Sequence, residues 1–244
     1  MNEILESLYN RKSVRVFEAA AIEPEKREAV LNAAMQAPTA GNQQMYTIIE
    51  IESPALKQQL SVSCDNQPFI AKAPLVLVFC ADLQKWYDAF IEGGASPRAP
   101  GAGDLMLAMQ DSTIAAQNTV VAAESLGLGS CYIGDIMENC EQHRQMLNLP
   151  PYVFPAVMLV LGYPTRQQKQ RTKPARCELR YMVHTNGYRR MEGAELREMF
   201  AKNLAHQSFE EWSRAFCERK YNSAFSREMT RSVQKYLEAF GVGE

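Results

Sequence analysis

The sequence predicts a layered protein of the α/β or α+β class, built as one large domain or two small ones. Three observations support this prediction. Apolar residues make up 46% of the 244 residues and charged residues 22%, as in ordinary globular proteins with a sizeable core. Strand patterns alternate with helix patterns along most of the chain. After residue 185 only helix formers and charged residues follow, without a further strand pattern.

Three segments have clear strand patterns, at residues 46–52, 73–82 and 152–164. Residues 73–82 form a continuous run of β-branched and apolar residues, which is typical of a strand that is buried on both faces. We expect a short strand or an extended loop at residues 130–136. These segments would form the sheet around which the helices pack.

Helices are expected between the strands. Asn2 can cap a short helix at the start of the chain. Glu23 and Pro24 mark the start of a second helix, which ends before Pro38, because proline is tolerated in a first turn and acids favour the positive helix end. A further helical stretch follows Pro54.

Residues 104–130 have the longest helical pattern. No charged residue occurs between Asp111 and Glu124, and apolar residues lie on all sides, so we expect a central helix that is buried all round. Gly127 and Gly129 would end this helix. The uncharged stretch is too short to span a membrane.

Composition and motifs exclude several classes of protein. A net charge of -2 provides no broad basic surface, so we expect neither a nucleic acid nor a membrane as a partner. The first residues lack the features of a signal peptide, so a cytoplasmic protein is expected. The six cysteines include no C-x-x-C pair and the three histidines have no ligand spacing, so no metal site is predicted. The glycines in the predicted loop 91–104 do not complete a dinucleotide-binding motif.

The stretch YNRKSVRVFE, residues 9–18, contains an unusual basic pattern. If it is extended, Arg11, Ser13 and Arg15 point to the same side, because side chains alternate with period two. Two guanidinium groups and a hydroxyl could then bind an anion such as a phosphate. The alternative is a solvated basic edge without a ligand.

A second basic segment, RQQKQRTKPARCELR at residues 166–180, follows the strand that ends at Gly162. Ligands often bind at loops beyond strand ends, although a solvated loop is the alternative interpretation. A single phosphate needs two or three cationic partners. The two basic segments could supply them from opposite sides.

Further motifs accompany these segments: Phe17 after R-x-S-x-R, APTAGNQQ at 37–44, GLGSCYIG after the long helix, and GYP followed by a K-P-x-R loop. Over roughly residues 1–185 the sequence thereby resembles the FMN-dependent nitroreductase family, in particular its flavin reductase and oxygen-insensitive nitroreductase branch. The resemblance implies an α+β fold: a mixed, mostly antiparallel sheet flanked by helices around a buried central helix, with a helical C-terminal arm.

The resemblance also implies which residues bind FMN. The first basic motif would hold the ribityl phosphate and the pyrimidine edge, with Arg11, Lys12, Ser13 and Arg15. The loop after the second helix would contact the isoalloxazine ring from the partner subunit, with Thr39, Asn42 and Gln43. Gln67 lies where the related branch places a glutamine on the flavin.

Two later segments complete the implied site. Backbone against the flavin ring would come from Tyr132, Ile133 and Gly134. Lys173 and Arg176 match the family's late basic residues near flavin N1/O2 and the phosphate, with Lys169 and Arg171 as nearby alternatives. Hydride transfer leaves negative charge at N1/O2, which Arg15 and Lys173 would stabilise. No side chain is assigned as a catalytic residue, because FMN carries the chemistry.

The function implied by the resemblance is that of a homodimeric enzyme with FMN at the subunit interface. NADPH or NADH would reduce FMN, and a nitroaromatic compound, a quinone or free flavin would then take the electrons in a ping-pong mechanism. Residues 1–185 would form the FMN-binding core. Residues 186–244 would wrap around the partner subunit, or form a helical subdomain of their own. The alternatives are a reductive dehalogenase or flavin-modifying enzyme on the same fold, or a flavin-binding protein without turnover.

Overall fold

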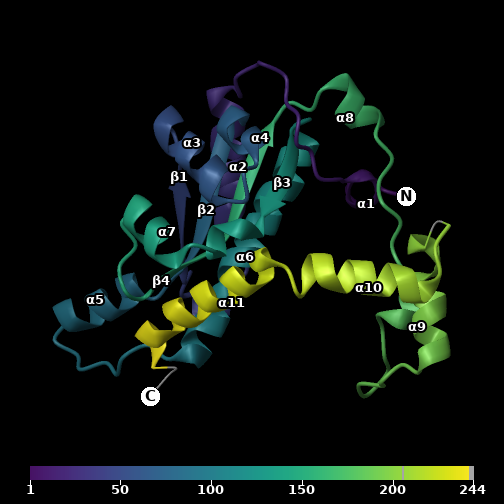
Figure 1. The fold of residues 1–244 in the computed structure, drawn as a ribbon. Helices are drawn as coiled ribbons and strands as arrows, with labels where there is room; N and C mark the ends of the chain where they lie inside the picture. Colours follow the sequence, from purple (N-terminus) through teal and green to yellow (C-terminus); the bar gives the residue numbers. More distant parts are fainter. Residues whose placement is uncertain (205, 242–244) are drawn as a thin grey trace. The chain divides into compact units, whose positions relative to one another are not determined.

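The structure, a computed structural model, describes residues 1–204 and 206–241, and Figure 1 shows the course of the chain. Two compact units are present. The first comprises Met1–Arg171 with Glu228–Glu244, and the second comprises Thr172–Arg227. The expected organisation into a core of residues 1–185 and an extension of residues 186–244 stays a prediction.

The first unit is built on a four-stranded antiparallel sheet with the strand order β1-β2-β4-β3. Its strands are β1 (Tyr46–Glu50), β2 (Leu75–Asp82), β3 (Gly129–Ile133) and β4 (Val153–Gly162). The two longest strands, β2 and β4, form the centre, and every residue of both is buried. All four segments were predicted as strands or extended, and the predicted fold class is confirmed.

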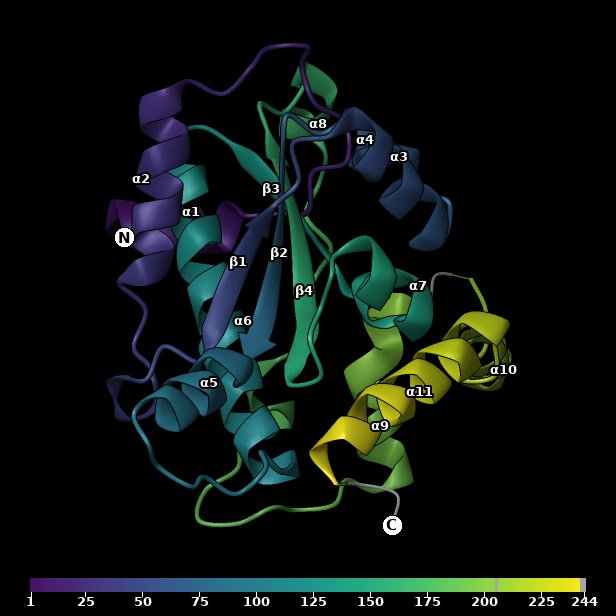
Figure 2. The ribbon, with the colours of Figure 1, turned by 90° about the vertical axis from the view of Figure 1, so that its left-hand side faces the viewer.

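Helices cover both faces of the sheet, as Figure 2 shows. Leu75, Leu77 and Phe79 of β2 pack on one face, with α2 (Pro24–Met35) and α6 (Ala102–Ser125). The alternate residues Val76, Val78 and Cys80 pack on the other face, with α3 (Pro54–Ser63) and α4 (Pro68–Lys72). Because successive side chains point to opposite faces, a strand covered on both sides must be apolar throughout.

Four further helices of the first unit lie around this centre. They are α1 (Glu3–Asn10), α5 (Gln84–Glu92), α7 (Cys140–Met146) and α8 (Arg166–Gln170). Asn2 caps α1 through a hydrogen bond from the Leu5 N–H to its Oδ1 (3.0 Å), as expected. Within residues 1–204 and 206–241, no helix is long and apolar enough to cross a membrane.

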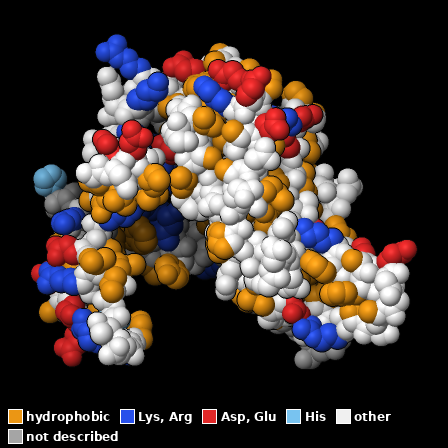
Figure 3. All heavy atoms as spheres, turned by 180° about the vertical axis from the view of Figure 1, so that it is seen from behind, with side chains coloured by type: hydrophobic (Ala, Val, Ile, Leu, Met, Phe, Trp, Pro, Cys, Tyr) orange, Lys and Arg blue, Asp and Glu red, His pale blue; other side chains and the backbone are white. Residues whose placement is uncertain are grey.

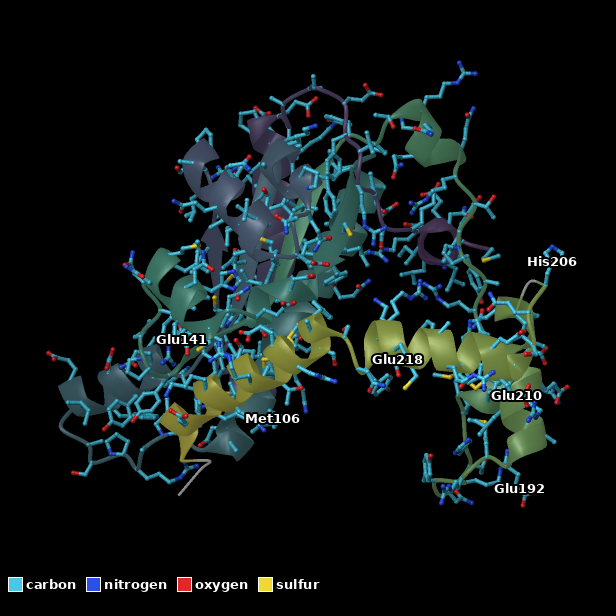
Figure 4. The ribbon with its side chains drawn as sticks, viewed as in Figure 1. Met106, Glu141, Glu192, His206, Glu210 and Glu218 are labelled. Atoms are coloured by element: carbon cyan, nitrogen blue, oxygen red, sulfur yellow. The ribbon has the colours of Figure 1, made fainter. Side chains whose placement is uncertain are left out.

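The long helix α6 differs from its prediction in one respect. Its small residues Ala115, Ala116 and Ala123 are buried against the sheet and α2, as a central helix requires. Its other side is exposed: 52% of Met106 is accessible, and Leu107 and Ile114 are also exposed (Figure 4). The prediction of burial on every side is therefore wrong for the single chain. The sheet and the neighbouring helices of the same chain cover only part of the apolar surface of α6.

The end of the chain belongs to the core of the first unit. Tyr236 of α11 (Ala224–Leu237) is completely buried and meets the Phe154 ring edge-on, at 4.8 Å between centroids. Ser232 Oγ accepts a hydrogen bond from the Cys140 N–H at the start of α7 (2.9 Å). Arg231 forms an ion pair with Glu141 (2.8 Å), which is labelled on α7 in Figure 4. These contacts tie the C-terminal helix to α7 and β4.

A buried carboxyl lies just before α7. The side chain of Glu138 is only 5% exposed, and within the described part of the chain its Oε1 has no hydrogen-bond partner. Burial, together with the nearby charges of Asp135, Asp65 and Glu228, raises the pKa of Glu138 to about 7. This carboxyl is therefore largely protonated in mildly acidic solution and largely ionised above neutrality.

The second unit is helical, as the sequence predicted for its residues after 185. Its main helices are α9 (Gly193–Phe200) and α10 (Phe209–Lys220). Trp212 joins them, with its ring 5.0 Å from that of Phe200 and 5.2 Å from that of Phe216. Arg197 on α9 also pairs with Glu210 on α10 (2.6 Å). Aromatic packing and an ion pair thus hold the two helices together.

Candidate functional site

The basic motif near the N-terminus runs as an extended segment beside β3, the edge strand of the sheet. Ser13 pairs with Ser130 in a parallel bridge, and the Val14 N–H donates to the Ser130 carbonyl oxygen (2.8 Å). Val14 is buried against Gly129, where an added Cβ would lie 2.5 Å from Val14 Cγ2. The glycine therefore leaves room for the Val14 side chain.

Arg11, Ser13 and Arg15 gather around one buried thiol, that of Cys131 on β3. Burial raises the pKa of Cys131, while Arg15, Ser13 and Arg11 each act in the opposite direction. The three residues therefore lie beside the part of β3 that contains this thiol. We call Arg11, Ser13 and Arg15 with Cys131 the cradle.

Arg11 has the most unusual environment in the cradle. Its guanidinium lies 5.7 Å from the centroid of the Tyr132 ring. Nε and Nη2 are buried, and neither has a hydrogen-bond partner in the part of the chain that the structure describes. The same holds for Ser130 Oγ on the neighbouring strand. Buried cationic donors without an acceptor are costly, so this arrangement fits an anionic ligand such as the phosphate of FMN.

The start of the second basic segment contacts the extended segment that carries Arg11, Ser13 and Arg15, which we call the cradle strand. Three hydrogen bonds join the two: Lys12 Nζ to the Lys169 carbonyl oxygen (2.7 Å), the Arg15 N–H to Gln168 Oε1 (3.2 Å), and Arg171 Nη2 to the Ser13 carbonyl oxygen (2.6 Å). Arg171 therefore adds a further cation beside the cradle. Lys12 is directed to α8 rather than to the thiol.

Lys173 and Arg176 belong to the second unit, which is described by itself. There the Arg176 Nη1 donates to the Pro174 carbonyl oxygen (3.3 Å). Their contact with a flavin stays a prediction. Of the two alternatives, Arg171 touches the cradle strand through its side chain, whereas Lys169 does so through its backbone.

Gln67 directly precedes α4. Its Nε2 donates to the carbonyl oxygen of Cys64 (2.9 Å), which fixes the side chain at the start of the helix. Two residues later, the Phe69 ring lies 5.9 Å from the guanidinium of Arg15. Gln67 is therefore close in sequence to a residue that borders the cradle.

Tyr132, Ile133 and Gly134 continue β3 beyond the cradle. Ser130 pairs with Ser13 at the outer edge of β3. Because the backbone groups of alternate residues face the same edge of a strand, the backbone of Tyr132 also faces this edge. The Tyr132 hydroxyl donates to Gln117 Oε1 (3.0 Å), and burial raises the pKa of this phenol to about 12. The segment thus offers backbone groups and a neutral ring next to Arg11.

The loop that contains Thr39, Asn42 and Gln43 is held by the long helix. The Asp111 carboxylate accepts hydrogen bonds from the Ala40 N–H (2.9 Å) and the Met45 N–H (3.2 Å). Thr39 Oγ1 accepts one from the Gln44 N–H (3.3 Å). The backbone turns sharply here, since Gly41 and Asn42 both have a φ of 57°. The loop is therefore fixed by the fold.

This loop lies at the opposite end of the sheet from the cradle. The cradle strand pairs with Ser130, which is opposite Leu161, and Leu161 is opposite Leu75 at the start of β2. Tyr46, just after the loop, is opposite Ala81 near the end of β2. Six residues of strand correspond to about 20 Å. Within one chain, the structure therefore does not bring Thr39, Asn42 and Gln43 to the cradle.

Several supporting residues were missed by the sequence analysis. One of them is Cys131, because nothing in the sequence indicates that this thiol lies near Arg11 and Arg15. Asp111 could have been found, because it is the last charged residue before a long uncharged helical stretch, and such a carboxylate must be paired when buried. Among the described residues, no three potential ligand side chains are grouped so that they could hold a metal ion.

Comparison with known proteins identifies the family of the chain. The family model described as "Nitroreductase family" matches residues 8–163. The chain is 33% identical to an FMN reductase (NADPH) of Bacillus subtilis over 190 residues, which covers 77% of this chain and 75% of that protein. It is 32% identical to an oxygen-insensitive NADPH nitroreductase of Salmonella typhimurium, covering 79% and 77% of the two chains.

A solved structure gives the same result for the fold. The NADPH:FMN oxidoreductase from Vibrio harveyi, complexed with NAD+, superposes with a TM-score of 0.80 at 25% identity, covering 96% of this chain and 98% of the other. The expected resemblance is thereby confirmed, as is the prediction of an enzyme. The chain belongs to the nitroreductase family.

Proposed function

We propose that this oxidoreductase binds FMN in the cradle beside β3 and passes electrons from NADPH or NADH through it to a nitroaromatic compound, a quinone or free flavin. The carrying observation is the buried guanidinium of Arg11, two of whose nitrogens have no acceptor within the described part of the chain. A phosphate oxygen would supply that acceptor. The relatives named FMN reductase and NADPH nitroreductase support the same donor and cofactor.

The residues around the cradle fit the chemistry of FMN. Arg11, Ser13 and Arg171 would hold the phosphate, since guanidinium groups donate two parallel hydrogen bonds to its oxygens. The backbone of Tyr132 to Gly134 would lie against the ring. Lys173 and Arg176 remain candidates for the N1/O2 edge.

The chemistry that bound FMN would supply is two-electron transfer, from the hydride of the nicotinamide to the acceptor. Arg15 would favour this by placing a positive charge where the ring becomes negative. No side-chain acid is assigned, so the acceptor would take its protons from solvent. Because donor and acceptor would use the same face of the flavin in turn, ping-pong kinetics are expected, with parallel lines in double-reciprocal plots. Intersecting lines would contradict a shared face of the flavin.

We further propose that the active enzyme is a homodimer with its flavin sites at the interface. The loop with Thr39, Asn42 and Gln43 lies about 20 Å along the sheet from the cradle, so a second copy would supply it to a flavin held there. Exposed apolar residues support an interface. They include Ile4, Leu5 and Leu8 of α1 and Met106, Leu107 and Ile114 of α6. Exposed apolar side chains are also visible from behind in Figure 3.

The decisive experiment is anaerobic addition of NADPH or NADH to purified protein. The proposal predicts a yellow protein whose flavin absorbance is bleached by at least one donor and restored by an acceptor. Colour without bleaching would instead indicate a flavin-binding protein without turnover. A colourless protein that takes up no FMN would contradict both functions, and turnover only with a halogenated aromatic would favour the dehalogenase alternative.

A further inference from the structure

The start of α7 is held by side chains from α11, which lies beside it in Figure 2. Glu228 Oε1 accepts hydrogen bonds from the Asn139 N–H (3.3 Å) and from Ser232 Oγ (2.8 Å), and Ser232 Oγ accepts one from the Cys140 N–H (2.9 Å). The Asn139 side chain is used elsewhere, because its Nδ2 donates to the Ser63 carbonyl oxygen at the end of α3 (2.8 Å). The first N–H groups of a helix lack partners inside the helix, so α11 supplies the N-terminal cap of α7.

The carboxyl of Glu138 directly precedes this cap and is surrounded by acidic groups. It is 5% exposed, and among the described residues its Oε1 has no hydrogen-bond partner. Burial raises its pKa to about 7, and three negative charges act in the same direction: Asp135 in the preceding turn, Asp65 after α3, and Glu228 on α11. A carboxylate formed here is therefore buried beside three like charges.

The other titratable groups near Glu138 do not offset its charge. Burial lowers the pKa of His143 on α7, so this imidazole is neutral near neutral pH. Burial raises the pKa of Cys64 at the end of α3, which therefore stays a thiol. Arg231 pairs with Glu228 (2.8 Å), but its side chain is 49% exposed, so water weakens its effect on the buried carboxyl.

We propose that Glu138 is a pH-sensitive switch that controls the attachment of α11 to α7. As a neutral acid it leaves Glu228 in place as the cap of α7. As a carboxylate it adds a buried like charge, and the repulsion is relieved when the first turn of α11 moves away and water reaches Glu138. The second unit ends at Arg227, so the switch acts at the point where the chain returns to the first unit.

The size of the effect follows from the pKa of Glu138 in the two states. It is about 7 while α11 is attached, and it returns to the ordinary value of 4.5 when detachment exposes the carboxyl to water. The detached state then binds fewer protons, so higher pH favours it. The equilibrium constant for detachment should rise about 10-fold between pH 6 and pH 8.

Hydrogen exchange of the full chain, measured by mass spectrometry at pH 6 and pH 8 and corrected for the intrinsic exchange rate at each pH, tests the switch. In the wild type, the protection of residues 138–146 and 228–237 should fall about 10-fold at the higher pH. Glu138→Gln keeps a neutral side chain of the same shape, so its protection should be equal at both. The matched control is Glu141→Gln, because the pKa of Glu141 is about 2 and its charge does not change over this range. The control should show the same 10-fold fall as the wild type.

A second variant separates repulsion by α11 from burial alone. Glu228→Gln keeps an oxygen acceptor for the cap but removes the like charge, so the fall in protection should be smaller than in the wild type. This variant also tests the switch if Glu138→Gln does not fold. An equal fall in the wild type and Glu138→Gln would overturn the proposal. Loss of protection in residues 138–146 while 228–237 stay protected would also overturn it, since Glu138 would then ionise without releasing α11.

Discussion

Replacing Arg11 by alanine should separate FMN binding from folding. In the structure this guanidinium is partly buried, and its Nε and Nη2 have no acceptor among the described residues. If a phosphate supplies that acceptor, Arg11→Ala removes charge-assisted hydrogen bonds worth about 1.5–3 kcal/mol. The dissociation constant of FMN should then rise about 10- to 140-fold.

The same substitution should leave the stability of the flavin-free protein nearly unchanged. It removes the contact of the guanidinium with the Tyr132 ring, worth about 0.5–1 kcal/mol, but also removes a buried cation without a counter-ion. These effects oppose each other, so the free energy of unfolding should change by less than about 1 kcal/mol.

Fluorescence titration of the flavin-free protein with FMN measures the first quantity, and urea unfolding measures the second. Arg166→Ala is the matched control, because Arg166 belongs to the second basic segment but is exposed. It should bind FMN like the wild type. An unchanged FMN affinity in Arg11→Ala, or an equal loss in both variants, would refute the assignment of Arg11 to the phosphate.

Three further predictions concern the packing of the first unit and its stability. Gly129→Ala should weaken FMN binding and cost about 1–3 kcal/mol in urea unfolding, because the added methyl collides with the Val14 side chain; an unaffected protein would show that Val14 can move aside without loss. Tyr236→Ala should cost about 3–5 kcal/mol, since its ring is fully buried on Phe154, and a smaller loss would mean that α11 contributes little to the core. The carboxyl of Glu138 keeps its proton in the folded state up to about pH 7 but loses it near pH 4.5 when unfolded, so stability should fall between these values by on the order of 3 kcal/mol. Glu138→Gln should reduce the difference between urea unfolding at pH 5 and at pH 8, and an undiminished difference would assign it to another group.

The sheet was predictable from the sequence because each strand has a physical signature. β2 and β4 are covered on both faces, so their sequences are almost entirely apolar, and β-branched residues in such runs favour a buried strand. Short elements such as α4, α7 and α8 were not predicted, since helices of five to seven residues carry too little periodicity to be recognised.

The exposed side of α6 shows another limit of prediction from sequence, which concerns what covers an apolar surface. The sequence indicates that Met106 and Ile114 are apolar, but an apolar side chain can be covered by its own chain or by a second copy. Periodicity cannot distinguish these cases. For the same reason, α11 looked like part of a separate arm, although its Tyr236 is as buried as any residue of the sheet.

The sequence predicted which residues of the extended segment form the cradle, but it could not predict which residues from elsewhere in the chain contact them. Period two places Arg11, Ser13 and Arg15 on one side of an extended strand, and the structure gathers them at Cys131. The sequence could not show that Arg171 reaches the Ser13 backbone, because that contact joins residues 158 positions apart.

The central claim is that the cradle recognises the phosphate of FMN. It is tested most directly by comparing the dissociation constants of FMN and riboflavin, which differ only in that phosphate, for the wild type and for Arg11→Ala. The account predicts that the wild type binds FMN much more tightly than riboflavin and that the substitution removes most of this preference. Equal affinity of the wild type for both flavins would contradict it.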